Sequence, residues 1–164
     1  MNAPALLSPA LSFVEFDDRH AEAFYAINAE WIAASFVLEE HDIVVLRQPR
    51  SMILDHGGLV RLAVLDGEVV GTCALIKTQP GCYELTKMAV VPAARGKKTG
   101  EALLRHMVQA ARTLPVERLY LLTSSKCEAA IHLYEKLGWV HDAGIMRDFG
   151  STYARSNVAM SYPL

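Results

Sequence analysis

The sequence predicts a mixed α/β fold with three consecutive antiparallel strands and a central strand pair joined by a helical crossover. Residues 59–76 alternate in hydrophobicity on both sides of a turn, which is typical of a hairpin. Residues 83–90 form a third strand that runs into a helix with a period of 3.6 residues, and residues 118–123 form a buried strand after that helix. Strand, helix and strand in this order make a crossover unit.

Length and composition set the outer limits. The chain has 164 residues, so we expect one domain over residues 1–164, with residues 1–10 as a loosely ordered lead-in. The apolar share is 52% and the formal net charge is −2, which gives no sign of a nucleic-acid surface. The start of the chain lacks the basic and apolar pattern of a signal peptide or membrane span, so no membrane partner is expected.

The cysteines indicate a reducing compartment. Cys73, Cys82 and Cys127 are odd in number and include no Cys-x-x-Cys pair. Neither a disulfide framework nor a zinc site follows from them, and the histidines show no metal-ligand spacing, so no metal is expected. The simplest location is the cytoplasm.

The N-terminal part predicts a strand and two helices. Residues 11–16 alternate as a strand, and Asp17 and Asp18 can cap the helix that follows. A second helix is predicted over residues 42–48, ending before Pro49. The core face of the first helix is predicted from apolar residues at helical spacing, namely Phe24, Ile27 and Trp31.

The hairpin is the clearest local signal. Residues 59–65 and 68–76 flank Asp66-Gly67, where glycine supplies the positive φ of a type I′ turn. Pro80-Gly81 makes the next turn and leads into the strand at 83–90.

Beyond residue 118 the sequence predicts a strand, a helix and two further strands. Ser125 and Glu128 fit a capping box for a helix that ends near Leu137, before Gly138. The remaining elements are predicted to be a strand, a loop and a last strand, over residues 139–141, 144–152 and 156–161.

The turn between the strand at 83–90 and the following helix predicts an anion site. It places Arg95, Lys97 and Lys98 beside the helix N-terminus, which carries unpaired N–H groups and partial positive charge. A phosphate is the simplest ligand for such a site.

This strand, turn and helix resemble the acetyl-coenzyme A (acetyl-CoA) site of the GNAT N-acetyltransferases. Their usual turn is Gln/Arg-x-x-Gly-x-Gly/Ala, and the matching residues here run from Arg95 to Gly100. Lys98 stands where the first motif glycine is expected, and Gly100 fills the last position. A lysine at that place fits only if its Cβ points away from the pyrophosphate.

A second segment extends the resemblance. Residues 130–139 are similar to the later GNAT motif Asn-x-x-Ala-x-x-Leu-Tyr-x-x-x-Gly-Phe, with Cys127 in place of Asn and Trp139 in place of Phe. Together the motifs cover roughly residues 59–140. The resemblance implies the GNAT fold, which is a mixed, mostly antiparallel central sheet flanked by helices, with a splayed parallel strand pair that holds the cofactor.

The same resemblance implies acetyl-CoA as co-substrate and assigns its contacts. The backbone before the turn would bond the pantetheine arm, the turn amides would hold the pyrophosphate, and the Val90 N–H would face the thioester oxygen. The implied cofactor-binding residues are Met88, Ala89, Val90, Arg95, Gly96, Lys97, Lys98, Thr99, Gly100, Cys127 and Tyr134.

Two residues are candidates for proton transfer. Tyr134 would protonate the departing thiolate, and the alternative is a core tyrosine in an apolar stripe. Glu84 would act as base, directly or through a water, because it lies six residues before Val90, where the resemblance places a catalytic glutamate in some of these enzymes. Alternation puts it on one strand face with Thr86, Met88 and Val90. The alternative for Glu84 is a structural ion pair with Lys87 or a nearby arginine.

The acceptor would be a small-molecule or peptide amine. Glu30, Trp31 and Tyr153 fall in regions that shape the acceptor pocket of such enzymes. The residue types alone favour a core role for Trp31 and solvated charges at Glu30 and Arg155. A homodimer is compatible with the resemblance.

The sequence therefore predicts an N-acetyltransferase in which a primary amine attacks acetyl-CoA directly. Two alternatives remain. One is a non-catalytic acyl-CoA-binding or sensor protein on the same fold, and the other is an interaction protein whose basic turn binds no nucleotide.

Overall fold

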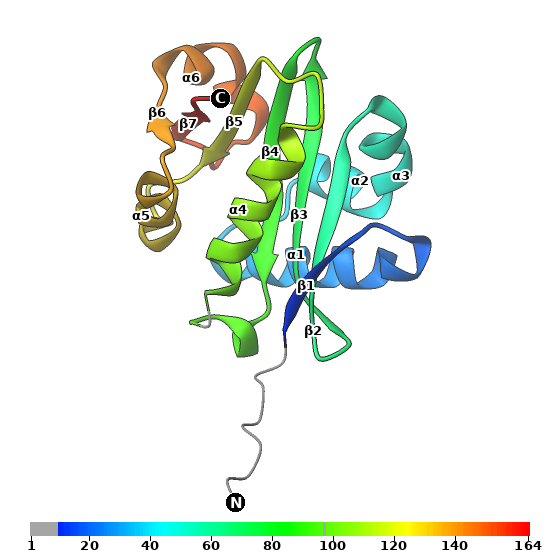
Figure 1. Ribbon diagram of the computed structural model, residues 1–164. Coiled ribbons are helices and arrows are strands. Elements are labelled where there is room, and N and C mark those ends of the chain that lie inside the picture. The colour runs from blue at the N-terminus through cyan, green and yellow to red at the C-terminus, as the bar shows by residue number, and fades with distance from the viewer. Residues whose placement is uncertain (1–9, 97) are drawn as a thin grey trace, which may run out of the picture.

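The computed structural model describes residues 10–96 and 98–164, and its described strands form one sheet in the order β1-β2-β3-β4-β5-β7-β6 (Figure 1). Neighbouring strands are antiparallel except β4 and β5, which are parallel. This confirms the predicted mixed, mostly antiparallel sheet. The strands are β1 (Leu11–Glu15), β2 (Leu59–Leu65), β3 (Glu68–Gln79), β4 (Cys82–Val90), β5 (Arg118–Thr123), β6 (Val140–His141) and β7 (Val158–Tyr162).

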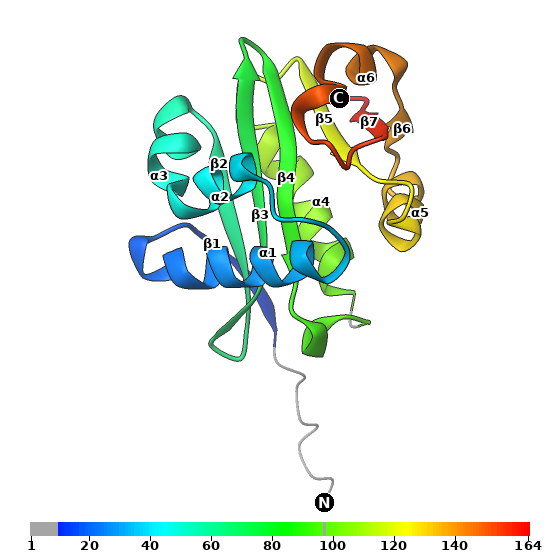
Figure 2. The same ribbon diagram turned by 180° about the vertical axis from the view of Figure 1, so that it is seen from behind.

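Helices cover both faces of the sheet, and the two views show α4 on one face and α1 with α2 on the other (Figures 1 and 2). Buried Leu103 and Met107 of α4 pack with Leu85 of β4, whereas Phe24 of α1 packs with Leu46 of α2 on the opposite face. The helices are α1 (Ala21–Ser35), α2 (Glu40–Arg47), α3 (Pro49–Met52), α4 (Thr99–Ala111), α5 (Glu128–Lys136) and α6 (Ala143–Phe149).

Short 3-10 turns join several of these elements. The turn η1 (Asp18–His20) precedes α1, and its N-cap Asp17 accepts a hydrogen bond from the Arg19 N–H, as the capping prediction requires. The others are η2 (Leu54–His56), η3 (Pro92–Ala94) and η4 (Gly150–Thr152).

The hairpin prediction is confirmed. Asp66 and Gly67 have φ values of 52° and 79°, the left-handed pair that a type I′ turn needs. The strand at 83–90 and the helix after it also lie where they were predicted, as β4 and α4.

Two local predictions are wrong. The predicted loop over 144–152 contains α6, because the Asp142 carboxylate caps the Ile145 N–H at 3.1 Å and α6 buries Ile145 and Phe149 against Tyr120. The predicted capping box at Ser125 is absent, since the N-cap of α5 is Cys127 and the Ser125 N–H donates to Asn157 Oδ1 at 2.8 Å.

A β-bulge in β4 is the feature that creates the site. Ala74 pairs with Thr86 and Thr72 with Ala89, so Lys87 and Met88 together lie opposite the single residue Cys73. Lys87 takes a left-handed backbone with φ of 53°. Although β4 continues to Val90, its recorded pairing with β5 ends at the Glu84–Tyr120 pair. The parallel strands are therefore splayed beyond Glu84, as the resemblance implies.

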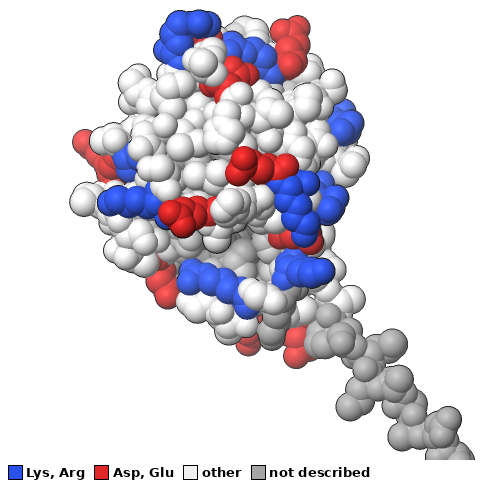
Figure 3. All heavy atoms as spheres, turned by 90° about the vertical axis from the view of Figure 1, so that its left-hand side faces the viewer, with Lys and Arg blue, Asp and Glu red and all other residues white. Residues whose placement is uncertain are grey.

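On the α5 side of the molecule, the described residues form no extended basic surface. On that face basic and acidic side chains are interspersed among uncharged ones (Figure 3). Across the described residues, no helix has both the length and the apolar character needed to span a membrane.

Candidate active site

The gap beside β4 opens into one groove made of three adjoining hollows. We call them the inner pocket, the channel and the outer cradle. The inner pocket lies at the β4 bulge, beside Asn28, Trp31, Thr86, Lys87, Tyr153 and Arg155. The channel runs along Met88, Ala89 and Val90 to Cys127 and Ala130. The outer cradle is formed by Arg95, Gly96, Lys98, Thr99, Gly100 and Lys136.

Shared lining residues make the groove continuous. Met88, Cys127 and Tyr134 line both the inner pocket and the channel. Val90 and Arg95 line both the channel and the outer cradle. A long ligand can therefore extend from the start of α4 to the bulge of β4.

The conformation of Lys98 explains the motif glycine that it replaces. Lys98 is the N-cap of α4 and has φ of 58° and ψ of 20°, a left-handed backbone that glycine adopts without strain. The lysine keeps the turn geometry at a conformational cost. Lys97 was also predicted to contact the cofactor and lies outside the described residues.

The outer cradle fits an anion. The Ala102 N–H donates to the Lys98 carbonyl at 3.0 Å and begins the helical ladder, so the amides of Thr99, Gly100 and Glu101 precede it. The Glu101 carboxylate lies 2.8 Å from Lys136 Nζ, which offsets its negative charge at the helix start. Oriented N–H groups with flanking cations match a pyrophosphate.

The edge of β4 offers a backbone donor in the channel. The Val91 N–H donates to the Val70 carbonyl in β3 at 2.9 Å. Because N–H groups alternate in direction along a strand, the Val90 N–H points to the opposite edge, where β5 has diverged. Arg95 Nε donates to the Val90 carbonyl at 3.0 Å on that same edge.

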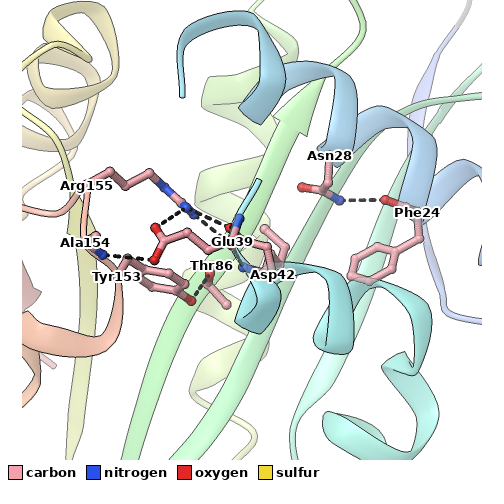
Figure 4. Close-up of polar contacts among 9 residues, drawn as sticks. Phe24, Asn28, Glu39, Asp42, Thr86, Tyr153, Ala154 and Arg155 are labelled. Atoms are coloured by element: carbon pink, nitrogen blue, oxygen red, sulfur yellow. Dashed lines mark hydrogen bonds and ion pairs between the residues drawn. The ribbon is translucent and has the colours of Figure 1, made fainter. Parts of the chain in front are cut away.

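A buried charge network underlies the inner pocket (Figure 4). Lys87 Nζ lies 2.8 Å from Asp42 Oδ1, with both side chains at most 2% exposed. Arg155 donates to both Asp42 oxygens at 2.8 and 2.9 Å and to Glu39 at 3.0 Å. The expectation that Arg155 is a solvated charge is wrong, because α2 brings Asp42 beneath it.

The network fixes the charge of its central acid. Burial raises the pKa of Asp42, but hydrogen bonds from Arg155 and Lys87 outweigh it and hold that pKa well below its usual range. Asp42 is therefore an anion between two cations at neutral pH. Lys87 is bonded to Asp42, which takes the place of the ion pair with Glu84 considered from the sequence.

A chain of hydrogen bonds holds the bulge in place. The Asn28 amide donates to the Phe24 carbonyl and to Thr72 Oγ1, both at 2.8 Å. Thr72 Oγ1 in turn donates to the Lys87 carbonyl at 2.9 Å. Asn28 and Thr72 are buried, so α1 and β3 together set the backbone of β4 where the strands separate.

Glu84 lies behind the inner pocket. It is 2% exposed, and burial raises its pKa to about 7. The charge of Lys87 and hydrogen bonds with the hydroxyls of Tyr153 and Thr86 act in the opposite direction and lower this pKa. Those two hydroxyls lie 3.3 Å apart and belong to residues that line the pocket. Glu84 itself is not among the described residues that line the pocket.

The predicted strand face of Glu84 is wrong in part. The bulge adds a residue, so alternation resumes on the other side and Val90 pairs with Gly71, whose added Cβ would meet Leu103 of α4. Glu84 instead faces the side of α1 and α2, together with Thr86. The single strand face predicted for Glu84, Met88 and Val90 is therefore divided between the two sides of the sheet.

Tyr134 lies where the inner pocket meets the channel. It is 8% exposed and belongs to the core that includes Trp139, so it packs as a core residue and also lines the groove. Burial raises its pKa, which keeps the phenol protonated at neutral pH. A protonated phenol in this place can donate a proton.

The acceptor candidates divide. Trp31 is half-buried and lines the inner pocket and the channel. Tyr153 is buried, with its ring 4.8 Å from Lys87 Nζ and 4.7 Å from the Arg155 guanidinium carbon. Glu30 is exposed and is not among the described residues that line the three hollows.

Sequence reasoning missed Asn28, Asp42 and Thr72 as parts of the site. Asp42 did carry a signal, because Val45 and Leu46 follow it at helical spacing and so place a charged residue on a buried face. Asn28 likewise lies one turn after Phe24 on the core face of α1. No described group of three or more His, Cys, Asp or Glu residues could hold a metal ion.

Comparisons with known proteins agree with this geometry. Residues 13–139 match the model of the acetyltransferase (GNAT) family. The uncharacterized N-acetyltransferase YjgM of Escherichia coli is 38% identical over 79 residues, which cover 46% of this chain and 47% of YjgM. An amino-acid acetyltransferase of Neisseria meningitidis is 33% identical over 93 residues, which cover 56% of this chain and 21% of that protein. The chain matches about half the length of YjgM and about a fifth of the second relative.

Solved structures share the fold. A GNAT-family acetyltransferase from Staphylococcus aureus superposes with a TM-score of 0.82 at 21% identity, covering 93% of this chain and 98% of the other. An acetyltransferase of Bacillus subtilis in complex with CoA superposes with a TM-score of 0.69 at 18% identity, covering 94% of this chain and 99% of the other. At such identities the likeness concerns the fold alone.

Proposed function

Because the chain belongs to the GNAT acetyltransferase family, we propose that it moves an acetyl group from acetyl-CoA to a primary amine by direct attack. The observation that carries the proposal is the continuous groove from the α4 N-terminus to the bulge of β4. The acceptor is a small-molecule or peptide amine, and residues 1–164 act as one domain.

The outer cradle and the channel would hold the cofactor. The amides of Thr99 and Gly100, with Arg95, Gly96 and Lys98, would bind the pyrophosphate. The pantetheine arm would lie along Met88, Ala89 and Val90, against Cys127 and Tyr134. Bound there, acetyl-CoA supplies an activated acetyl group.

The Val90 N–H is the proposed donor to the thioester oxygen. Its direction follows from the bond of the neighbouring Val91 N–H to Val70. A fixed backbone donor aimed at developing negative charge typically contributes about 10²–10³ in rate.

Glu84 is the proposed base. With its pKa raised to about 7, it can accept a proton from the acceptor ammonium at neutral pH. Since Thr86 and Tyr153 line the pocket and Glu84 does not, the proton would pass through one of their hydroxyls or a water. The amine then attacks with its lone pair.

Tyr134 is the proposed acid. Its protonated phenol lines the groove at the junction where the thioester end would lie. Donation of that proton to the departing thiolate would complete the transfer.

Thermal melting with acetyl-CoA tests the first step. A ligand at about 100 times its Kd adds about 2.7 kcal/mol of stability, so a clear rise in Tm is expected. Gly100→Val should abolish the rise, because an added Cβ meets only Leu133 and Met88 at 3.9 and 4.0 Å and the larger side chain would occupy the cradle. Ala102→Val places the same side chain in α4 outside the cradle and should keep the rise. No shift in the unmodified protein would reject cofactor binding.

A second candidate is a non-catalytic acyl-CoA-binding protein. The burial of Glu84 behind two hydroxyls favours it, since the proposed base has no direct contact with the pocket. Turnover decides between the two. Release of CoA that depends on an added amine supports the enzyme, whereas a melting shift without turnover over a broad amine panel supports the binding protein.

A further inference from the structure

The inner pocket presents one sign of charge. Among the described residues that line it, the charged ones are Lys87 and Arg155, and none is Asp or Glu. The carboxylates that balance them, Asp42 and Glu39, bond to the cations from outside this lining. The Lys87 side chain is 2% exposed and that of Arg155 is 17% exposed, so the Arg155 guanidinium is the cation that a ligand in the pocket can reach.

Arg155 has hydrogen-bonding capacity left. Its recorded bonds to Glu39 and Asp42 use three of the five guanidinium N–H donors, from Nη1 and Nη2. Within the described chain, the Nε–H and the second Nη2 hydrogen have no recorded partner. The side chain is 17% exposed, and the Tyr153 ring 4.7 Å away restricts its movement. These donors suit a carboxylate, which arginine binds through paired hydrogen bonds.

Asn28 offers the complementary acceptor. Within the described part of the chain, both hydrogen bonds of its side chain come from the amide nitrogen, so the amide oxygen is left to accept. In Figure 4 that oxygen points away from Phe24, toward the side where Arg155 lies. An acceptor amine could donate an N–H to it.

The rest of the pocket wall has an apolar part beside the hydroxyl residues Thr86, Thr123, Ser124 and Ser156. Trp31, Ile32, Phe36, Leu121 and Leu122 line it. Burial of an aliphatic side chain against them would be favourable. A polycationic ligand would find no acidic lining to match it.

We infer that the acceptor is an apolar amino acid or similar amino-carboxylate, with its carboxylate on Arg155 and its amine near Asn28. This rests on the proposed function for the identity of the pocket. It goes beyond that function by naming the chemical class of the acceptor and the residue that selects it.

Calorimetric titration in the presence of CoA tests the inference without any acetyl transfer. L-Leucine is compared with L-leucinamide, which lacks the carboxylate charge, with 3-methylbutylamine, which lacks the carboxylate, and with spermidine. Loss of hydrogen bonds to a charged group lowers affinity by about ten- to a hundred-fold, so L-leucine should bind at least about tenfold tighter than the others. Equal or tighter binding of any other ligand would overturn the inference, as would binding of none.

Two variants assign the preference. Arg155→Gln should bring the affinities for L-leucine and L-leucinamide together, and Arg155→Lys should restore part of the difference. Arg147→Gln removes an exposed arginine of α6 and should leave the preference intact. If Arg155→Gln does not fold, the ligand series on the unmodified protein still decides.

The outcome separates this inference from the proposed function. A binding preference for L-leucine without acetyl transfer would support the inferred ligand class and reject the proposed enzymatic function. Acetylation of all tested amines without preference would support the proposed enzymatic function and reject the inferred ligand class.

Discussion

The outer cradle and the inner pocket are built in opposite ways. The cradle consists of backbone amides and basic side chains that come mostly from neighbouring residues, as with Arg95, Gly96 and Lys98, and Lys136 of α5 adds one cation. The inner pocket depends on buried charges from distant parts of the chain, since Asp42 of α2 pairs with Lys87 of β4 and with Arg155. The cofactor end is thus a local motif, and the acceptor end is a product of tertiary packing.

This difference has an energetic consequence. An exposed lysine in the cradle can change with little effect on folding, because water already solvates it. Each charge under the inner pocket is kept by its partners, and removing one leaves the others buried and unbalanced. Substitutions at the two ends should therefore separate effects on binding from effects on stability.

The largest expected effect is on folding. Asp42→Asn removes the anion between Lys87 and Arg155 and should lower the free energy of unfolding by about 3–5 kcal/mol, measured by urea denaturation at pH 7. Asp148→Asn breaks the more exposed pair with Arg118 at 3.2 Å and should cost less than about 1 kcal/mol. A similar small loss for both would mean that the network is not buried in solution.

Next in size is the loss of the proposed base. Glu84→Gln should lower kcat/KM by about 10²-fold at neutral pH, because Gln cannot accept the proton. In the unmodified protein the rate should rise as pH increases through about 7, where Glu84 ionises. If the variant keeps that pH profile, another group is the base.

The same variant also has a signature in stability. The pKa of Glu84 is raised from 4.5 to about 7, so its contribution to stability is present below pH 4.5 and is lost as pH rises through 7. As pH rises from 4.5 to 8, the free energy of unfolding of Glu84→Gln should therefore increase by roughly 3 kcal/mol relative to that of the unmodified protein. If the free energies of unfolding of the variant and the unmodified protein depend on pH in the same way, Glu84 is exposed to solvent rather than buried.

A smaller effect is expected at the junction of the hollows. Tyr134→Phe should lower kcat by about tenfold or more while the Kd for CoA stays nearly unchanged, since the ring still packs against Trp139. Stopped-flow turnover and calorimetry give the two numbers. Full activity would leave Tyr134 as a packing residue.

The smallest effect is expected in the cradle. Lys98→Ala and Lys98→Gly both remove the ammonium, but only glycine adopts the φ of 58° without strain. Both variants should bind CoA about two- to tenfold more weakly than the unmodified protein, and the alanine variant should bind it more weakly than the glycine variant. The affinity for pantetheine should stay unchanged. An equal loss for CoA and pantetheine would show that Lys98 does not contact phosphate.

The sequence predicted the features that rest on neighbouring residues. The Asp66-Gly67 hairpin, β4, and the α4 that follows the basic turn come from local periodicity and turn chemistry. It missed α6, because the seven residues of Ala143–Phe149, which include Gly144 and end before Gly150, carry too short a period to outweigh the glycines. The face of Val90 was wrong since alternation assumes no bulge, and the left-handed Lys87 is held by Thr72 from another strand.

The acid network lay beyond sequence reasoning for a related cause. Asp42 and Arg155 are 113 positions apart, and Glu39 and Arg155 are 116 apart, so no local pattern joins them. A charged residue at a buried helical position marks that a partner exists without identifying it.

The carboxylate of Glu39 bonds both the Ala154 N–H and the Arg155 side chain, and so ties the start of α2 to the segment before β7. Closing so long a loop is slow, because its entropy is lost before the contact compensates for it. The cradle needs only residues from Val90 to Lys136. During folding, the outer cradle should therefore form early, and the inner pocket should be among the last parts of the molecule to form.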